Sequence, residues 1–150
     1  MRPGAWTVTG FLAADASLGE VLAADGAELE RLSVRAGELG ERLRELLERG
    51  SKSDWFRGKR VGEHRVELHR RRGLLTCPWA REEFAACPVG RGSGPTSNEF
   101  VLVHVPSRAR LEGLELHAHL IGDHGFFGGP GTEYRLEPES VAAVVLPSGA

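Results

Sequence analysis

The sequence predicts an α+β fold in which an N-terminal helical segment precedes a small antiparallel sheet carrying one or two helices. Three observations predict it. Apolar residues recur at helical spacing between residues 17 and 50, apolar and polar residues alternate in several stretches after residue 60, and glycine-rich turns separate those stretches. The chain has 150 residues, so we expect a single domain over 1–150, helical over about 15–50 and sheet-containing over about 55–150.

The first fifty residues predict a short strand followed by helices. The stretch AWTVTGF alternates in the manner of a half-buried strand. A helix is expected after Ser17 as N-cap, and Asp25-Gly26 predicts a turn before a short helical piece. The clearest helix, with Ser33 as N-cap, has an apolar stripe over 34–49 that either packs on the core or forms a homodimer surface.

The strands are expected in the second half. After a polar connector over 50–60, RVELHRRRGLLTCPW predicts a strand pair with a turn at Arg72-Gly73, and EFVLVHVP predicts a strong strand. GLELHAHLIGDHGFF either begins as a strand and ends as a helix, or forms one helix that ends at Gly125. FGGPGTEYRLEP predicts a turn leading into a further strand, and PESVAAVVL predicts a closing helix with Pro138 near its start.

Charge is unevenly distributed along the chain. The net charge is −3 over residues 1–50, +6 over 51–110 and −5 over 111–150. The basic middle either marks an anion-binding surface or faces the acidic parts within the fold, and the absence of an aromatic-rich stacking pattern favours the second interpretation. In a nucleic-acid-binding module, phosphates would be contacted by the basic side chains of this segment, Arg57, Lys59, Arg60, Arg65, Arg70, Arg71 and Arg72.

Composition also bears on the setting of the protein. No stretch approaches the ~20 apolar residues of a membrane span. The N-terminus makes a poor signal peptide because polar residues interrupt its apolar run, so we expect a cytoplasmic protein in which Cys77 and Cys87 are thiols, metal ligands or core residues rather than a disulfide. Arginine outnumbers lysine 17 to 2, with one Asn and no Gln, as in proteins of GC-rich or thermophilic organisms.

Two Cys-Pro steps and a histidine cluster carry the strongest candidate chemistry. Zinc takes four tetrahedral N and S ligands, and Cys77, Cys87, His119 and His124 offer two of each. The nine residues between the cysteines exceed the two to four of zinc knuckles, so buried thiols and ordinary histidines remain the alternative. On a regular helix, residues five apart point roughly 140° apart, so the pair His119 and His124 needs a distortion of the helix, which Gly122 and Gly125 could permit.

An alternative set of metal ligands lies in HAHLIGDHGFFGG, which resembles the metal-binding stretch of the metallo-β-lactamase-like hydrolases. The matching residues are His117, His119, Asp123 and His124. Apart from this resemblance, His117 and His119 would share one face if they lie on a strand. With His124 they could form the open three-ligand site of a small metal-dependent hydrolase, with Asp123 or Glu115 as the base. The stretch departs from the family pattern, because three residues separate His119 from Asp123 where that family has one, and only 26 residues follow His124.

Other motifs predict no further chemistry. The glycine-rich stretch after His124 lacks the Gly-Lys-Ser/Thr ending of a phosphate loop, and no signature of a cysteine nucleophile surrounds either thiol. The leading hypothesis is therefore a non-enzymatic binding or regulatory module stabilised by zinc. A small metal-dependent hydrolase and a nucleic-acid-binding module are the alternatives.

Overall fold

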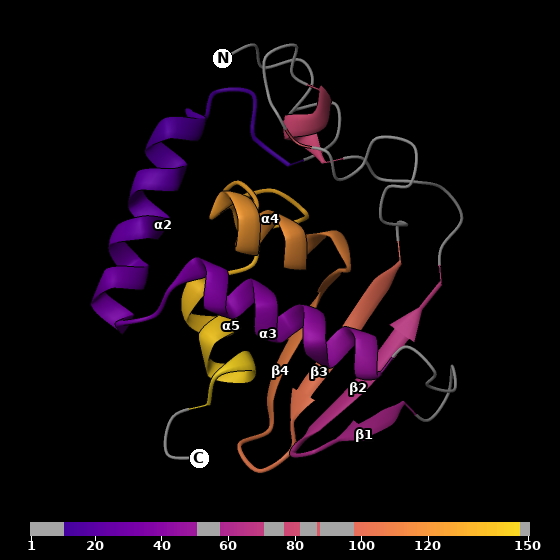
Figure 1. Cartoon of the computed structure of the whole chain (residues 1–150). Coiled ribbons are helices and arrows are strands. Elements are labelled where there is room, and N and C mark those ends of the chain that lie inside the picture. Colours follow the sequence, from indigo (N-terminus) through magenta and orange to yellow (C-terminus); the bar gives the residue numbers. More distant parts are fainter. Residues whose placement is uncertain (1–10, 51–57, 71–76, 82–86, 88–97, 148–150) are drawn as a thin grey trace.

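The structure is a computed structural model that describes residues 11–50, 58–70, 77–81, 87 and 98–147 (Figure 1). Its elements follow in the order α2 (Leu18–Leu32), α3 (Ala36–Arg49), β1 (Lys59–Val61), β2 (His64–His69), the 3-10 helix η1 (Pro78–Arg81), β3 (Glu99–His104), β4 (Ala109–Leu114), α4 (Leu116–His124) and α5 (Pro138–Val145). The strands form one antiparallel sheet in the order β1-β2-β3-β4. The predicted α+β fold, with a helical segment first, is confirmed.

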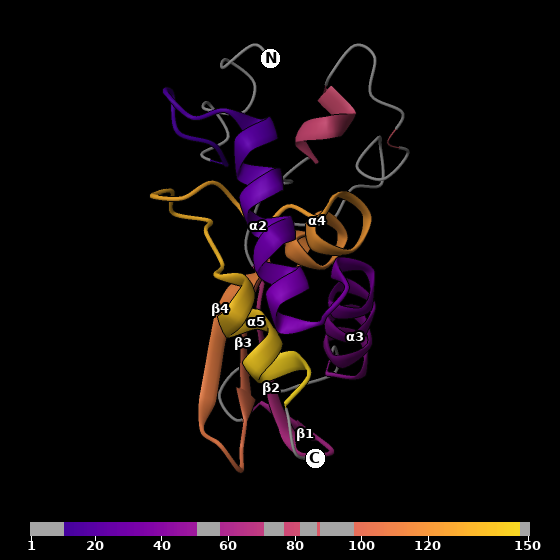
Figure 2. The ribbon, with the colours of Figure 1, turned by 90° about the vertical axis from the view of Figure 1, so that its left-hand side faces the viewer.

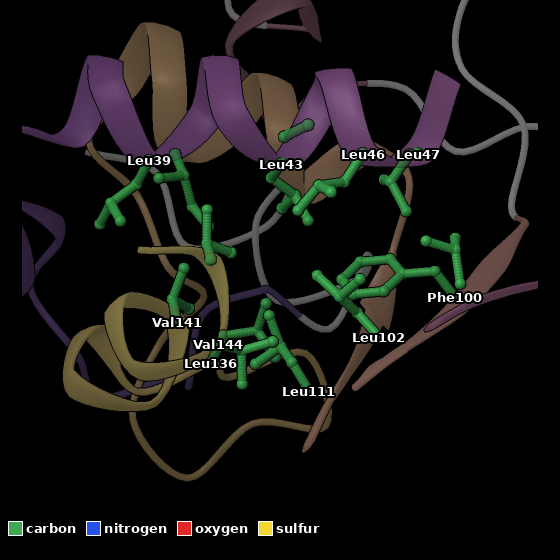
Figure 3. Close-up of a cluster of buried hydrophobic side chains, with 14 of the residues drawn as sticks. Leu39, Leu43, Leu46, Leu47, Phe100, Leu102, Leu111, Leu136, Val141 and Val144 are labelled. Atoms are coloured by element: carbon green, nitrogen blue, oxygen red, sulfur yellow. The ribbon is translucent and has the colours of Figure 1, made fainter. Parts of the chain in front are cut away.

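One face of the sheet forms most of the core. Val66, Leu102 and Leu111 lie side by side in register and are buried, because alternation sends every second side chain to the same face. Helices α3 and α5 cover this face (Figure 2). Figure 3 shows the resulting group of side chains, which we call the sheet cluster and which includes Leu39, Leu43, Leu46, Leu47, Val66, Phe100, Leu102, Leu111, Leu136, Val141 and Val144.

A second, smaller hydrophobic cluster lies around the start of α2 and one side of α4. We call it the cysteine cluster, because both thiols belong to it; its buried members are Phe11, Leu12, Leu18, Val21, Cys77, Cys87, Leu114, Leu116, Leu120 and Phe126. Helix α4 packs on both clusters, since Ala118 and Ile121 belong to the sheet cluster. This helix therefore positions whatever chemistry the cysteine cluster carries.

The helical segment differs from expectation at both of its predicted breaks. Ser17 is the N-cap of α2, as predicted, and accepts a hydrogen bond from the Glu20 N–H. The turn predicted at Asp25 and Gly26 is wrong, because α2 continues to Leu32 while the buried Asp25 carboxylate pairs with Arg135. Ser33 was predicted to begin α3. It instead ends α2 in the left-handed conformation.

The packing of α3 settles where its apolar stripe points. Leu39, Leu43 and Leu46 are fully buried in the sheet cluster, so the stripe considered above as a homodimer surface lies inside the chain. On the neighbouring side α3 approaches α4 closely at Gly40. A Cβ on Gly40 would lie only 2.3 Å from the Cα of Gly122, so the two helices meet backbone to backbone.

The strands confirm part of the sequence prediction. The stretch after residue 108 begins as strand β4 and continues as α4, which ends at a left-handed Gly125. Strand β1 lies in the expected polar connector, and the strand expected after the glycine-rich turn is wrong, since residues 128–137 carry no strand. The predicted N-terminal strand lies almost entirely outside the described residues. The predicted turn at Arg72-Gly73 lies wholly outside them.

Candidate metal centre

The structure brings the two cysteines and two of the histidines to one place. Cys77 immediately precedes η1, and Cys87 lies further along the same connection between β2 and β3. His119 and His124 come from α4. One ligand atom from each of the four residues lies within 4.8 Å of the other three, and no other such group of His, Cys, Asp or Glu occurs among the described residues.

Three of the distances between these ligand atoms are close to those of a tetrahedral zinc site. The sulfurs of Cys77 and Cys87 are 3.8 Å apart. The sulfur of Cys77 lies 3.5 Å from Nε2 of His124, and the sulfur of Cys87 lies 3.3 Å from Nε2 of His119. Zinc–sulfur bonds of ~2.3 Å and zinc–nitrogen bonds of ~2.05 Å in a tetrahedron require about 3.8 Å between sulfurs and about 3.6 Å between sulfur and nitrogen. The group can therefore hold a metal ion.

Burial makes the centre a closed one. Cys77, Cys87 and His119 are at most 6% exposed, and His124 is half-buried. Burial lowers the pKa of His124, and the neighbouring His119 lowers it further. A neutral imidazole is the form that binds a metal. With two thiols and two imidazoles around one point, every tetrahedral position is supplied by the protein.

Asp123 supports the centre from outside it. Nδ1 of His119 donates a hydrogen bond of 2.6 Å to the Asp123 carboxylate, which leaves Nε2 directed at the cysteines. Arg44 on α3 lies 3.7 Å from the same carboxylate. A carboxylate in this place fixes the tautomer and raises the basicity of a ligating imidazole. The structure thus uses Asp123 as the partner of a candidate ligand, a role that the sequence analysis missed although residues 119 and 123 stand one helical turn apart.

The two histidines meet without a break in their helix. Helix α4 is regular from Leu116 to His124 and ends at Gly125, so the expectation that the pair needs a distorted helix is wrong. The rings of His119 and His124 lie edge to face with centroids 4.9 Å apart, because each side chain can turn its ring toward the cysteines. Trp79 of η1 stacks on His124 at 4.0 Å with an interplanar angle of 2°, which holds that ring in place.

His117 does not join this group. Its Nδ1 accepts a hydrogen bond from the Leu114 N–H, and its Nε2–H donates to the Tyr134 carbonyl. Burial lowers the pKa of His117 to about 4, so the ring is neutral and fastens β4 to the loop before α5. The three-histidine set of the hydrolase alternative is therefore not assembled. Its proposed base Glu115 lies just before α4 and accepts a hydrogen bond from Asn98.

The basic segment is only partly described. Arg57, Arg71 and Arg72 lie outside the described residues, whereas Lys59, Arg60, Arg65 and Arg70 lie on or next to β1 and β2. Acidic residues interrupt this part of the segment: Arg65 pairs with Glu67 on the same strand. The described residues thus form a mixed surface rather than a uniformly basic one.

No helix in the described part of the chain combines the length and the apolar character needed to cross a bilayer. No protein-family model matches this chain, and comparisons with the curated proteins and with the solved structures also return no match.

Proposed function

We propose that this chain is a binding or regulatory module without catalytic activity of its own, and that one zinc ion bound by Cys77, Cys87, His119 and His124 completes its fold. The observation that carries the proposal is the gathering of four ligand atoms within 4.8 Å of one another. One sulfur–sulfur and two sulfur–nitrogen distances among them agree with a tetrahedral Cys2His2 centre to within about 0.3 Å. Thiolate together with imidazole is the ligand set typical of zinc.

The number of ligands supports a structural role for the metal. A catalytic zinc keeps one position open for water or substrate, and here all four positions are filled by buried or half-buried side chains. The metal would tie the connection between β2 and β3 to α4, in addition to the contacts that described residues of these two parts make in the cysteine cluster. A metal bound in this way is expected to hold a binding surface for a partner in place rather than to support a reaction.

Metal content tests the proposal directly. The full chain, purified without a histidine tag, is expected to carry one zinc per molecule, and replacing the zinc by cobalt should give the visible absorption of a tetrahedral thiolate site. The variants Cys77→Ala and His119→Ala should lose the metal. His69→Ala removes a histidine from β2, outside the group, and should keep it. A wild-type chain with no zinc after growth in zinc-supplemented medium would overturn the proposal.

The absence of catalysis is tested on the same samples. Zinc-loaded protein is expected to hydrolyse simple ester, amide and phosphoester substrates no faster than the metal-free Cys77→Ala variant. Turnover that depends on zinc and disappears in His117→Ala, while metal content is retained, would instead support the hydrolase alternative.

A further inference from the structure

The face of the sheet that points away from the helices carries charges sorted by sign into rows. We call it the open face, because no helix among the described residues contacts it. In one row, arginines flank a central valine, and strand register places them side by side: Arg60, Arg65, Val103 and Arg110. In the next row, two residues away along each strand, glutamates flank a second valine: Glu67, Val101 and Glu112.

This arrangement is poorly compensated within one chain. Arg60 lies directly opposite Arg65, and like charges in directly opposed positions destabilise a sheet. Arg65 pairs with Glu67 at 3.4 Å and Arg110 with Glu112 at 2.5 Å, each along its own strand. The second pair is largely exposed, with Arg110 59% and Glu112 62% accessible, whereas in the first Arg65 is 47% and Glu67 27% accessible. Exposed pairs contribute only about 0–1 kcal/mol.

The rows are complementary to themselves under a twofold rotation. Two copies can be placed with their open faces together, related by a twofold axis that runs between the two rows and parallel to them. This rotation places the arginine row of one copy on the glutamate row of the other. Each strand then lies over the same strand of the other copy. Arg65 and Arg110 of one chain then face glutamates of the other, and the glutamates face arginines. A contact that is self-complementary in this way is the requirement for an isologous dimer.

The centre of the open face is suited to the middle of such a contact. Val101 and Val103 lie on it along β3, and Val105, directly after the strand, is the only exposed large apolar side chain in the described part of the chain. A hollow of about 210 Å³ lies beside the valines, lined also by Arg65, Glu67 and Arg110. Apolar residues surrounded by charges are the usual composition of a protein–protein interface.

We propose that the open face binds a second copy of this chain, with each arginine row lying on the glutamate row of the other copy. Three strands about 4.8 Å apart and about six residues long cover on the order of 300 Å². This is below the ~800 Å² per partner of a standard interface. The dimer is therefore weak and is held largely by charge, so its dissociation constant should rise at least tenfold between about 0.05 M and 0.5 M salt, where screening is strong.

Two variants with opposite charges test the pairing. The first, Arg65→Glu with Arg110→Glu, gives both rows a net negative charge although Arg60 remains. The second, Glu67→Arg with Glu112→Arg, makes both rows basic. Each variant alone should sediment as a monomer at concentrations where the wild type dimerises. An equimolar mixture of the two should form a heterodimer that is at least as tight as the wild-type dimer. Zinc content and circular dichroism of each variant check that the fold is retained.

Three outcomes would overturn the proposal. They are a wild-type chain that stays monomeric at millimolar concentration in low salt, a wild-type dimer that the two variants do not weaken, and a mixture that pairs no better than its components. If a variant fails to fold, Val103→Lys provides the second test. It places a charge at the centre of the contact, and it should abolish dimerisation without loss of zinc.

Discussion

The sheet cluster and the cysteine cluster differ in what encloses them. The sheet cluster lies between a four-stranded sheet and helices, and nearly all of its buried residues belong to regular elements. In the cysteine cluster, five of the ten buried residues lie outside helices and strands: Phe11, Leu12, Cys77, Cys87 and Phe126. Irregular segments lack a ladder of backbone hydrogen bonds, so another restraint must hold their side chains in the core. The comparison therefore indicates that a metal is needed in the cysteine cluster rather than in the sheet cluster.

Removing the metal should have the largest effect, and it should affect the cysteine cluster more than the sheet cluster. Structural zinc contributes about 10–16 kcal/mol in small zinc-finger peptides. Part of this chain is held by other contacts, so we expect a loss of at least about 3 kcal/mol in the free energy of unfolding. Chelation should abolish hydrogen-exchange protection around Cys77, Leu116 and Leu120, while the amides of β2 and β3 stay protected. Equal loss of protection in both clusters would show that the metal stabilises the fold as one unit.

Truncation in the sheet cluster should have the reverse effect. Leu43 is fully buried in it, and Leu43→Ala should lower the free energy of unfolding by about 2–5 kcal/mol. The metal-to-protein ratio should stay at one, because Leu43 belongs only to the sheet cluster. Urea unfolding and elemental analysis provide the two measurements, and loss of zinc in this variant would contradict the separation of the clusters.

The contact between α3 and α4 joins the two clusters and can be tested with one methyl group. At Gly40 the added Cβ would lie 2.3 Å from a backbone atom of α4, so Gly40→Ala should cost about 1–3 kcal/mol through overpacking. Gly26 is the matched control, since a Cβ there meets nothing within 4 Å and α2 is helical at this position. Gly26→Ala should raise the free energy of unfolding by up to about 1 kcal/mol. Similar melting temperatures for the two variants would contradict the close packing.

The carboxylate behind His119 should have a measurable effect on metal affinity. Asp123→Asn removes the charge but keeps the shape, and the loss of such a partner weakens metal binding by about 10–100-fold. Competition with a chelator of known affinity measures the change. Glu41→Gln, at an exposed position on α3, serves as the control and should leave the affinity unaltered. An Asp123→Asn variant with unchanged affinity would show that the hydrogen bond does not assist the metal.

The smallest effect concerns a buried histidine of the sheet. Burial lowers the pKa of His64, and the nearby His104 and Arg42 lower it further, while its Nε2–H donates to the Val144 carbonyl. The unfolded state therefore binds the additional proton below about pH 6.5, and folding stability should fall as the pH drops below that value, by at most about 1.4 kcal/mol per pH unit. Urea unfolding between pH 7.5 and 5 should give a shallower decline for His64→Phe than for wild type. Parallel curves would exclude His64 as the cause.

Sequence reasoning located the candidate centre but not all of its surroundings. The four candidate ligands follow from residue type, because few arrangements make use of two thiols and two imidazoles. The stacking of Trp79 on His124 could not be predicted, since it depends on a contact between a connection and a distant helix. Within the fold, amphipathic α3 and the alternating β3 were the readily predicted elements, because their periods are regular.

The errors at Asp25 and Ser33 arose where another interaction outweighs a local preference. Asp25-Gly26 has the composition of a turn, but the partner of Asp25 is 110 residues away in the sequence. Ser33 has the composition of an N-cap, but the left-handed conformation that ends α2 is adopted at this residue instead. In both cases the local preference is about 1 kcal/mol or less. The ion pair with Arg135 can exceed it at Asp25, and at Ser33 the N–H instead donates to the Leu29 and Glu30 carbonyls at the end of α2.

The link between Asp25 and Arg135 also sets an order of events during synthesis of the chain. Arg135 donates to both carboxylate oxygens of Asp25 at 2.7 and 2.8 Å, and both side chains are largely buried. Ribosomes add about 5–20 residues per second, so α2 leaves the ribosome several seconds before Arg135 is made. During that interval Asp25 lacks Arg135, its partner in the fold. Helix α2 is therefore expected to dock late, once the segment before α5 has emerged.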